Sequence, residues 1–374
     1  MSGNRFFIFG YYGWKNVGDD AMLYALLREL NTIDSEARYA VLSSITTVIP
    51  SEVKNRVKFV RLSYFAVGWE ILRSSAFVLG GGTHLFDYGK KLMVLKIQLR
   101  IFILVLLSKL LRKKVYLLGN GLGPFPTAWG RFLSRLICHL ADYISVRDEA
   151  SYRFLASWGL KTKASLAFDL SALIENHEDS KTNLPQGNKK ILGISILPVF
   201  QVYNGSREKD SLLIGEFAKS INALLGEIPL LEVCLFVFKG KSRDDDVEIT
   251  KMLLDQLQPA KRVKLVQYDP DPRIMLAQVS SCTAFVGMRY HSCIFAYLLS
   301  IPMLIINYHP KCRDFAEDIG LPAHAVVSLG EVLDGQFQER LKNLIESPKD
   351  FNPTLAINQA RQRAKEGVKG VKIR

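Results

Sequence analysis

The chain has 374 residues, of which 48% are hydrophobic and 23% charged, a composition typical of a globular protein and not of a disordered one. Its length predicts two domains. The net charge of +13 favours acidic small molecules, anionic membranes or nucleic acids as partners. Nucleic acid is disfavoured because the chain has no Lys- and Arg-rich block with interleaved aromatics, no zinc-finger pattern and no RNA-binding signature.

Cysteine usage indicates a reducing compartment. The five cysteines are odd in number and no two have C-x-x-C spacing, which argues against a disulfide framework and against structural zinc. The N-terminus leads straight into an apolar run without the features of a signal peptide, so we expect a cytoplasmic protein.

The most apolar helical stretch, residues 101–108, lies between Arg100 and Lys109 and is too short to span a bilayer. Further cations follow it, including Lys113 and Lys114. One interpretation is a buried helix with a solvated end. The alternative is a basic, apolar surface that makes a peripheral contact with the inner face of an anionic membrane, which would suit an acceptor carried on a lipid.

In the first half of the chain, short apolar runs alternate with amphipathic stretches. Each run is followed by a glycine-rich or polar turn and predicts a strand. The predicted strands are residues 6–9, 39–43, 76–79, 114–118 and 143–146. A helix is predicted from about Asp19 to Leu30. The repeated order of strand, turn and helix predicts a parallel sheet covered on both faces.

The pattern pauses in a polar stretch and then restarts. Further strands are predicted at residues 191–196, 232–238, 263–266, 284–286 and 303–307. We therefore expect an N-terminal Rossmann-like domain on the acceptor side, a linker, a C-terminal Rossmann-like domain on the donor side and a basic C-terminal helix or tail, at residues 1–174, 175–190, 191–350 and 351–374. The fold class is α/β, with the two domains facing across a cleft, and ligands should bind at the carboxyl ends of the strands.

The first loop, residues 10–20 (GYYGWKNVGDD), matches neither a dinucleotide-binding nor a Walker glycine pattern. Asp19 or Asp20 can cap the following helix. Acidic residues at a helix start argue against phosphate there, and they suit sugar hydroxyls or a general base better.

Three further turns follow strands of the first domain. Residues 80–87 (GGGTHLFD) and 119–124 (GNGLGP) predict loops with exposed backbone, and His84 is a candidate ligand contact in the first of them. In the turn at residues 146–149, Asp148 should cap a helix and Arg147 should pair locally.

The turn at residues 287–292 (GMRYHS) combines Arg289 and His291 between a buried strand and a packed helix. Backbone N–H groups at a helix start favour anions; Arg289 adds a bidentate grip on phosphate or carboxylate, and His291 adds a proton near neutral pH. Lys311 and His309 follow the next strand and should lie nearby, because sequential strands in such sheets are usually neighbours.

Other motifs are less informative. The charged loop at residues 239–246 should be mostly solvated. No G-x-S-x-G elbow, no H-E-x-x-H helix and no carboxylate pair at metal spacing occurs, so the sequence does not support a hydrolase or a metalloenzyme.

Four motifs in order, residues 10–20, 79–82 (LGGG), 145–148 (SVRD) and 287–291 (GMRYH), resemble the polysaccharide pyruvyltransferase family over nearly the whole chain. The resemblance implies two Rossmann-like domains arranged as in GT-B glycosyltransferases. It implies transfer of the enolpyruvyl unit of phosphoenolpyruvate to two hydroxyls of a sugar of a cell-surface polysaccharide or its lipid-linked precursor, which gives a cyclic pyruvate ketal and free phosphate. It implies no metal and no cofactor other than this co-substrate.

In the family the Arg-x-His turn serves phosphoenolpyruvate binding and catalysis, which maps onto Arg289 and His291. We expect His291 to act as general acid and Arg289 to hold phosphate or carboxylate, with Tyr290, Lys311 and Lys239 also on the donor side. Asp19 is the second catalytic candidate. The candidate acceptor contacts are Tyr12, Asn16, Asp20, Gly81, Gly82 and His84.

The chain departs from the family pattern at one position. Many relatives carry an Arg after the first strand of the second domain, where this chain has Leu197. Lys239, Arg243 or Lys311 would then supply the second cation. The alternatives to a pyruvyltransferase are a GT-B glycosyltransferase that uses a nucleotide-sugar and a non-catalytic partner in polysaccharide assembly.

Overall fold

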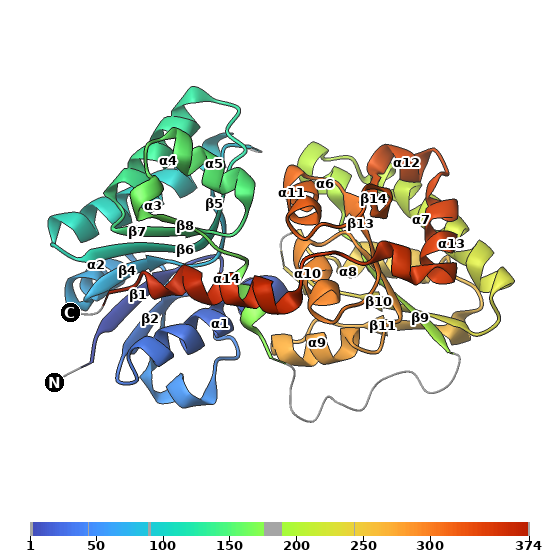
Figure 1. The fold of residues 1–374 in the computed structure, drawn as a ribbon, viewed down its shortest axis with the longest axis horizontal. Coiled ribbons are helices and arrows are strands. Elements are labelled where there is room, and N and C mark those ends of the chain that lie inside the picture. The colour runs from blue at the N-terminus through green and yellow to red at the C-terminus, as the bar shows by residue number, and fades with distance from the viewer. Residues whose placement is uncertain (1–2, 44, 89–90, 176–188, 243, 373–374) are drawn as a thin grey trace. The chain divides into compact units, whose positions relative to one another are not determined.

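The computed structural model divides into two compact units, each built on one parallel sheet (Figure 1). The first unit comprises Met1–Trp14, Asp19–Ile174 and Asn358–Arg374, and the second comprises Lys15–Gly18 and Glu175–Ile357. The structure describes residues 3–43, 45–88, 91–175, 189–242 and 244–372.

The sheet of the first unit has the strand order β3-β2-β1-β4-β6-β7-β8, and β5 pairs with β6. The strands are β1 (Arg5–Phe9), β2 (Arg38–Leu42), β3 (Val57–Val60), β4 (Ala76–Leu79), β5 (Gly82–Leu85), β6 (Lys114–Leu122), β7 (Tyr143–Val146) and β8 (Ala164–Leu166). The helices are α1 (Val17–Ile33), α2 (Tyr64–Arg73), α3 (Lys91–Leu110), α4 (Ala128–Leu140), α5 (Glu149–Ser157) and α14 (Ile357–Lys369). The strand order reverses at β1 and β4, so ligands of such a sheet are expected at their carboxyl ends.

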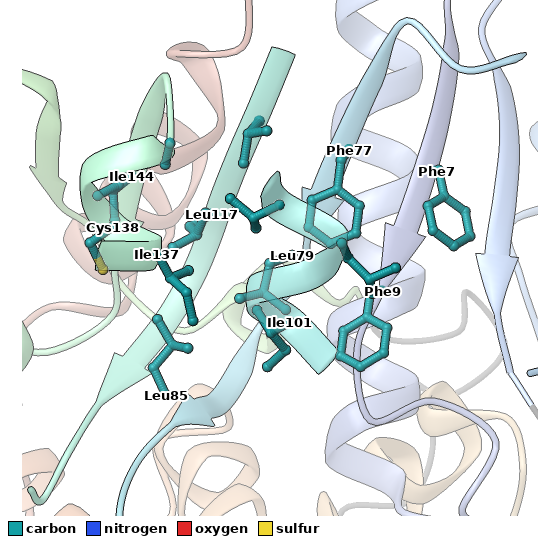
Figure 2. Packing of buried hydrophobic residues seen from close by; sticks show 14 of the residues in the cluster. Phe7, Phe9, Phe77, Leu79, Leu85, Ile101, Leu117, Ile137, Cys138 and Ile144 are labelled. Carbon is teal, nitrogen blue, oxygen red and sulfur yellow. The ribbon is translucent and has the colours of Figure 1, made fainter. Parts of the chain in front are cut away.

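Alternate residues of these strands form the core under α2 to α5. The register places Phe7 opposite Phe77 and Phe77 opposite Val115, which aligns three apolar side chains on one face of the sheet. They are buried together with Ile101 of α3 and Ile137 of α4 (Figure 2). Because the residues between them are buried as well, these strands read as continuous apolar runs, as in parallel sheets covered on both faces.

The C-terminal helix α14 belongs to the first unit, although the sequence alone assigned residues 351–374 to neither domain. A Cβ added to Gly367 would lie 2.6 Å from the Cβ of Ala167, so the helix backbone packs directly on the segment after β8. The hydroxyl of Tyr116 donates a hydrogen bond to the carbonyl of Lys372 (2.9 Å). These contacts join the end of the chain to its first half.

The second unit has the strand order β11-β10-β9-β12-β13-β14, again all parallel. The strands are β9 (Lys190–Ser195), β10 (Leu231–Phe236), β11 (Val263–Val266), β12 (Ala284–Gly287), β13 (Met303–Asn307) and β14 (Val326–Ser328). The helices are α6 (Val199–Asn204), α7 (Arg207–Glu227), α8 (Val247–Leu254), α9 (Pro272–Val279), α10 (Tyr290–Leu298), α11 (Pro310–Asp318), α12 (Leu329–Leu333) and α13 (Phe337–Glu346). Here the order reverses at β9 and β12.

The predicted α/β class with two Rossmann-like domains is confirmed, and every predicted strand overlaps an observed one. The sequence missed β3, β5, β8 and β14, which are only three or four residues long. The loop predicted at residues 119–124 is wrong in its first part, because β6 continues to Leu122. Likewise β5 takes up residues of the second predicted loop, and Gly82 at its start is a poor strand former by itself.

Two other expectations concern the linker and a membrane-spanning helix. The predicted linker at residues 175–190 falls largely on residues 176–188, which lie outside the described residues. Within the described ranges, no helix has both the length and the apolar composition needed to cross a bilayer.

Candidate active site

Arg289 and His291 lie where β12 ends and α10 begins. β12 ends at Gly287, which is paired with Ser195 at the end of β9, and β13 lies on its other side. Arg289 is the N-cap of α10, with an extended backbone (φ −70°, ψ 131°). The predicted strand-to-helix turn is therefore confirmed, and it stands at the switch point of the second sheet, where ligands of this fold class bind.

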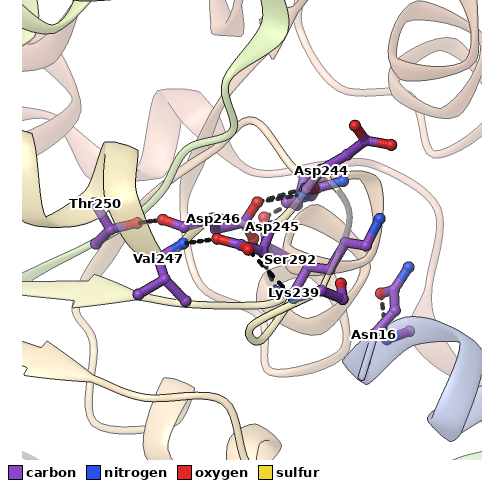
Figure 3. A network of polar contacts seen from close by, with 11 residues as sticks. Asn16, Lys239, Asp244, Asp245, Asp246, Val247, Thr250 and Ser292 are labelled. Atoms are coloured by element: carbon purple, nitrogen blue, oxygen red, sulfur yellow. Dashed lines mark hydrogen bonds and ion pairs between the residues drawn. The ribbon is translucent and has the colours of Figure 1, made fainter. Parts of the chain in front are cut away.

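The guanidinium of Arg289 is held by Asp246, a residue 43 positions earlier in the chain. Its Nε donates to Oδ1 of Asp246 (2.8 Å), and its Nη2 donates to the same oxygen and to the carbonyl of Asp244 (2.9 Å). Asp246 is fully buried, and its Oδ2 accepts the backbone N–H of Lys239 (2.9 Å) (Figure 3). One carboxylate therefore orients both the Arg289 side chain and the Lys239 backbone.

The prediction that residues 239–246 form a mostly solvated loop is wrong at both of its ends. Lys239 and Asp246 are buried, and Asp245 accepts the N–H of Val247 at the start of α8 (2.9 Å). The reason is that the carboxylates satisfy backbone donors in the turn instead of facing water. Arg243, a candidate second cation, lies outside the described residues.

Burial and charge pairing determine the electrostatics of this pair. Burial raises the pKa of Asp246, and the guanidinium of Arg289 opposes that shift. Burial acts to lower the pKa of Arg289, but the carboxylate of Asp246 outweighs it and the pKa is raised, so the side chain stays cationic. None of the hydrogen bonds among the described residues uses Nη1 of Arg289, so the N–H groups at this edge of the guanidinium can donate to a bound anion.

Lys311 lies close to the same turn, as predicted from the neighbouring strands. Its Nζ is 5.7 Å from the ring centroid of Tyr290 and 5.6 Å from that of Tyr308. His309 is the N-cap of α11, and its Nδ1 accepts the backbone N–H of Lys311 (3.3 Å). The ends of β12 and β13 thus bring one Arg, one Lys and several aromatic rings together.

His291 packs against the backbone of the first glycine loop. Residues Lys15–Gly18 belong to the second unit, where the N–H of Val17 donates to the carbonyl of Phe238 (3.0 Å). A Cβ on Gly18 would lie 1.9 Å from Cγ and Nδ1 of His291, so only glycine leaves room for this imidazole.

The start of α1 differs from the prediction in its capping. The helix begins at Val17, and the side chain of Asn16 accepts the N–H of Gly18 (3.2 Å). Asp19 and Asp20 therefore lie in the first turn of α1 and do not precede it. Oδ1 of Asp20 accepts the hydroxyl of Thr47 (2.9 Å), a contact that the sequence did not predict.

At the end of β9 the chain presents Ser195 and Leu197. Leu197 is buried and apolar, so it supplies no cation. Ser195 is fully buried, and its hydroxyl has no hydrogen-bond partner within the described part of the chain. Because buried hydroxyls are normally satisfied, Ser195 is a further candidate contact for a ligand or water at the switch point.

In the first unit a buried ion pair joins the segments that follow β7 and β8, and it also contacts the start of β5. Nη1 of Arg147 donates to Asp169 (2.8 Å) and Nη2 donates to the hydroxyl of Thr83 (2.9 Å). The main ionic partner of Arg147 is therefore Asp169, 22 positions away. The predicted local pairing corresponds to a longer contact, between Nε of Arg147 and Oδ2 of Asp148 (3.7 Å). The predicted capping of α5 by Asp148 is confirmed (2.7 Å to the N–H of Ser151).

Tyr12 lies inside the first unit. A Cβ on Gly80 would lie 2.0 Å from its hydroxyl, and one on Gly10 would lie 2.4 Å from its ring, which explains both glycines. Burial, followed by the carboxylates of Asp19 and Asp169, raises the pKa of Tyr12, so the phenol stays protonated. Asp19, Tyr12 and Asp169 therefore form one polar group at the carboxyl ends of this sheet.

His84 is buried next to the glycine turn that follows β4. Its Nε2 lies 3.0 Å from the carbonyl oxygen of Gly81, which the neutral ring satisfies when it carries its proton on Nε2. Burial lowers the pKa of His84 to about 4, and the charge of Arg147 acts in the same direction. His84 is thus a neutral hydrogen-bonding group at pH 7.

Within the described residues, no group of three or more His, Cys, Asp or Glu side chains is placed to hold a metal ion.

The chain matches the family described as polysaccharide pyruvyl transferase over residues 16–310. It is 21% identical over 264 residues to the amylovoran biosynthesis protein AmsJ of Erwinia amylovora; the match covers 67% of this chain and 62% of that protein, less than two thirds of its length.

Solved structures share the fold at low sequence identity. The S. aureus MnaA–UDP structure is 12% identical with a TM-score of 0.61, covering 97% of this chain and 94% of that one. Anabaena HepE in complex with UDP-glucose is 11% identical with a TM-score of 0.59, covering 98% and 100%.

Proposed function

Because the chain belongs to the polysaccharide pyruvyl transferase family, we propose that it transfers the enolpyruvyl group of phosphoenolpyruvate to two hydroxyls of one sugar. The acceptor is a polysaccharide or its lipid-linked precursor. The product is a cyclic pyruvate ketal, and inorganic phosphate is released. The observation that carries the proposal is the placement of Arg289 and His291 at the N-terminus of α10, at the switch point of the second sheet.

The reaction needs one proton donor and a site for two anionic groups. The methylene carbon of phosphoenolpyruvate gains a proton and becomes a methyl group. The bond between C2 and the phosphate oxygen breaks, and two bonds form between C2 and the sugar oxygens. The two hydroxyl protons balance the one taken up at carbon and the one that leaves with phosphate.

The second unit supplies the donor side of this proposal. His291 donates the proton to the methylene carbon. The Nη1 edge of Arg289 binds phosphate or carboxylate, and Lys311, beside Tyr290, binds the other anion in place of the cation that Leu197 cannot provide. The backbone N–H groups at the start of α10 add a positive field. Lys239 contributes charge next to Asp246.

The first unit supplies the acceptor side. Asp19 acts as general base on a sugar hydroxyl, and Asn16, in the short segment that belongs to the second unit, binds a neighbouring hydroxyl. Asp20 is buried and accepts the hydroxyl of Thr47, so its part is to hold the segment of Thr47 and not to touch the acceptor. His84 is buried and bonded to the carbonyl of Gly81, so with Gly81 and Gly82 it shapes the turn next to the acceptor and does not touch the sugar. Tyr12 is enclosed, so its part is to hold Gly10 and Gly80 in place and not to touch the acceptor directly. No metal and no further cofactor takes part.

Phosphate release from phosphoenolpyruvate, measured against a set of soluble and lipid-linked glycans, tests the reaction. We expect release only with an acceptor, accompanied by a glycan that gains one pyruvate and loses one water in its mass spectrum. His291→Gln should lower the rate about 100-fold, the usual contribution of a positioned general acid. His324→Gln is the matched control because that imidazole is exposed.

A folded His291→Gln protein with full phosphate release would overturn the assignment of the acid. A nucleotide-sugar donor is the competing outcome, since S. aureus MnaA and Anabaena HepE share the fold and were solved with UDP or UDP-glucose. Thermal stabilisation by a UDP-sugar, with none by phosphoenolpyruvate, would favour that donor.

A further inference from the structure

The charge of this chain is concentrated in one stretch of the first unit. Residues 61–141 contain twelve Lys and Arg but only two carboxylates, a surplus of ten out of the net +13 of the whole chain. Both carboxylates are buried. Glu70 pairs with Arg5 and with Lys58 (2.8 Å), and Asp87 accepts the N–H of Thr127 (3.0 Å). The stretch therefore has no exposed carboxylate of its own, and the next residue, Asp142, pairs with only two of its cations, Lys109 (2.8 Å) and Lys114 (3.1 Å).

The same stretch exposes large apolar side chains. One face of α3 is exposed, because exposed residues spaced three, four or seven positions apart lie on the same side of the helix. They are Leu92, Lys96, Leu99, Ile103 and Leu110. The opposite side of α3 is buried in the core. The exposed face thus mixes leucine and isoleucine with lysine.

The neighbouring helices extend this surface. α3 packs against both α2 and α4. On α2, Phe65 is 83% exposed and Trp69 is 48% exposed, and on α4 Phe132 is 66% exposed. Three adjacent helices therefore present aromatic and aliphatic side chains to solvent, a pattern that marks an interaction surface on soluble proteins.

A basic pocket adjoins the surface at the C-terminal ends of α2 and α3. It has a volume of about 430 Å³, and Arg73, Arg112 and Lys113 are among its lining residues. The guanidinium of Arg73 also lies over the exposed ring of Trp69, 5.6 Å from its centroid, so the pocket and the apolar surface are continuous. A pocket lined by five cationic residues beside an exposed indole suits the phosphate of a lipid headgroup.

We propose that the exposed face of α2, α3 and α4 docks on an anionic lipid bilayer. The apolar side chains enter the headgroup region while the cations between them contact lipid phosphates. A second copy of the chain fits less well, because a symmetric pairing would bring two strongly cationic surfaces together. Docking does not depend on the proposed reaction, but it would place the first unit next to an acceptor carried on a lipid.

Flotation with vesicles of phosphatidylcholine, with and without about a third phosphatidylglycerol, tests the proposal on the full chain without substrate. We expect binding to the anionic vesicles only, and release at high salt. Neutralising Lys96 and Arg100 together (Lys96→Gln, Arg100→Gln) should weaken binding about fivefold for each cation, the equivalent of about 1 kcal/mol per charge at an anionic surface. The matched control neutralises two exposed lysines of the second unit, Lys251→Gln and Lys261→Gln.

The apolar contribution needs its own variant. Phe65→Ser with Ile103→Ser should abolish flotation, whereas Leu212→Ser with Leu230→Ser, at exposed positions of the second unit, should not change it. All four positions are exposed, and unchanged thermal unfolding confirms that the variants fold.

Two results would overturn the proposal. One is equal flotation with neutral and anionic vesicles, or flotation with neither. The other is a dimer or a complex with an acidic protein that the double Ser variant dissociates, because another protein would then cover this face.

Discussion

Arg289 illustrates how a single side chain depends on a distant one. Its guanidinium is held on two nitrogens by the buried carboxylate of Asp246, so the cation is oriented before any ligand arrives. A pre-oriented group binds an anion without the entropic cost of ordering a flexible side chain. Asp246 is therefore a positioning residue, and its contribution should be visible in donor binding.

Asp246→Asn should raise the KM for phosphoenolpyruvate about tenfold with a smaller change in kcat, because a charge-assisted hydrogen bond contributes about 1.5 kcal/mol. Steady-state phosphate release measures both constants. Asp255→Asn, at an exposed position, is the control. An unchanged KM in a folded Asp246→Asn protein would show that the orientation of Arg289 does not matter for the donor.

The stability of the first unit should depend on pH through His84. Its pKa in the fold is about 4, below the ordinary value of 6.5, so protonation favours the unfolded state. The stabilisation is fully present above pH 6.5 and is lost as the pH falls from 6.5 towards 4.

We expect this one group to contribute about 3 kcal/mol to the loss of stability over that window, from about 1.4 kcal/mol for each unit of pKa shift. Urea unfolding of the parent protein and of His84→Gln at several pH values measures the difference. The parent should lose more stability on acidification than the variant, and parallel pH profiles would contradict the prediction.

At the scale of elements, the start of α1 and the start of α10 fit each other. The backbone at Gly18 leaves just enough room for the imidazole of His291, and the N–H of Val17 is bonded to the segment after β10. Gly18, which precedes Asp19 and Asp20, thus provides the space that His291, the proposed proton donor, occupies. The order of elements alone could not predict this contact, since 273 positions separate the two residues.

Gly18→Ala should displace His291 and lower kcat about 100-fold, the contribution of a positioned general acid, while the protein stays folded. Gly215→Ala is a matched control, because no atom lies within 4 Å of the added Cβ in the middle of α7. That control should stabilise the helix by about 1 kcal/mol. Equal activity of both variants would separate His291 from the proposed chemistry.

At the scale of the whole molecule, the chain crosses between its two units more often than the sequence indicated. Residues Lys15–Gly18 belong to the second unit and Asn358–Arg374 belong to the first, so each domain is completed by a segment from outside its main range. Damage to α14 should therefore destabilise the first unit although α14 follows the second in sequence.

Gly367→Leu should reduce the stability of the first unit by about 1–3 kcal/mol, because the added side chain meets Ala167 and Ser145. Hydrogen exchange should accelerate in β7 and β8 and stay unchanged in β10 to β13. Lys365→Ala, at an exposed position on the same helix, is the control. Faster exchange in the second unit instead would contradict the assignment of α14.

Much of the local structure was predictable because its causes are local. Short continuous apolar runs predicted ten of the strands, the Asp148 cap follows from a carboxylate just before α5, and the Arg289–His291 turn follows from a strand that meets a helix. The missed strands are short, so their stability comes from neighbouring strands and not from their own residues.

By itself, the sequence determined the α/β class, the carboxyl-end loops and the motifs that identify the family. Only the tertiary structure decided that β9 lies beside β12, that Asp246 holds Arg289 and that Arg147 pairs with Asp169. Only it decided which apolar residues of α2 to α4 face solvent. Hydrophobic period and capping act over a few residues, whereas strand order, buried ion pairs and exposed faces depend on contacts between segments that the chain brings together only when it folds.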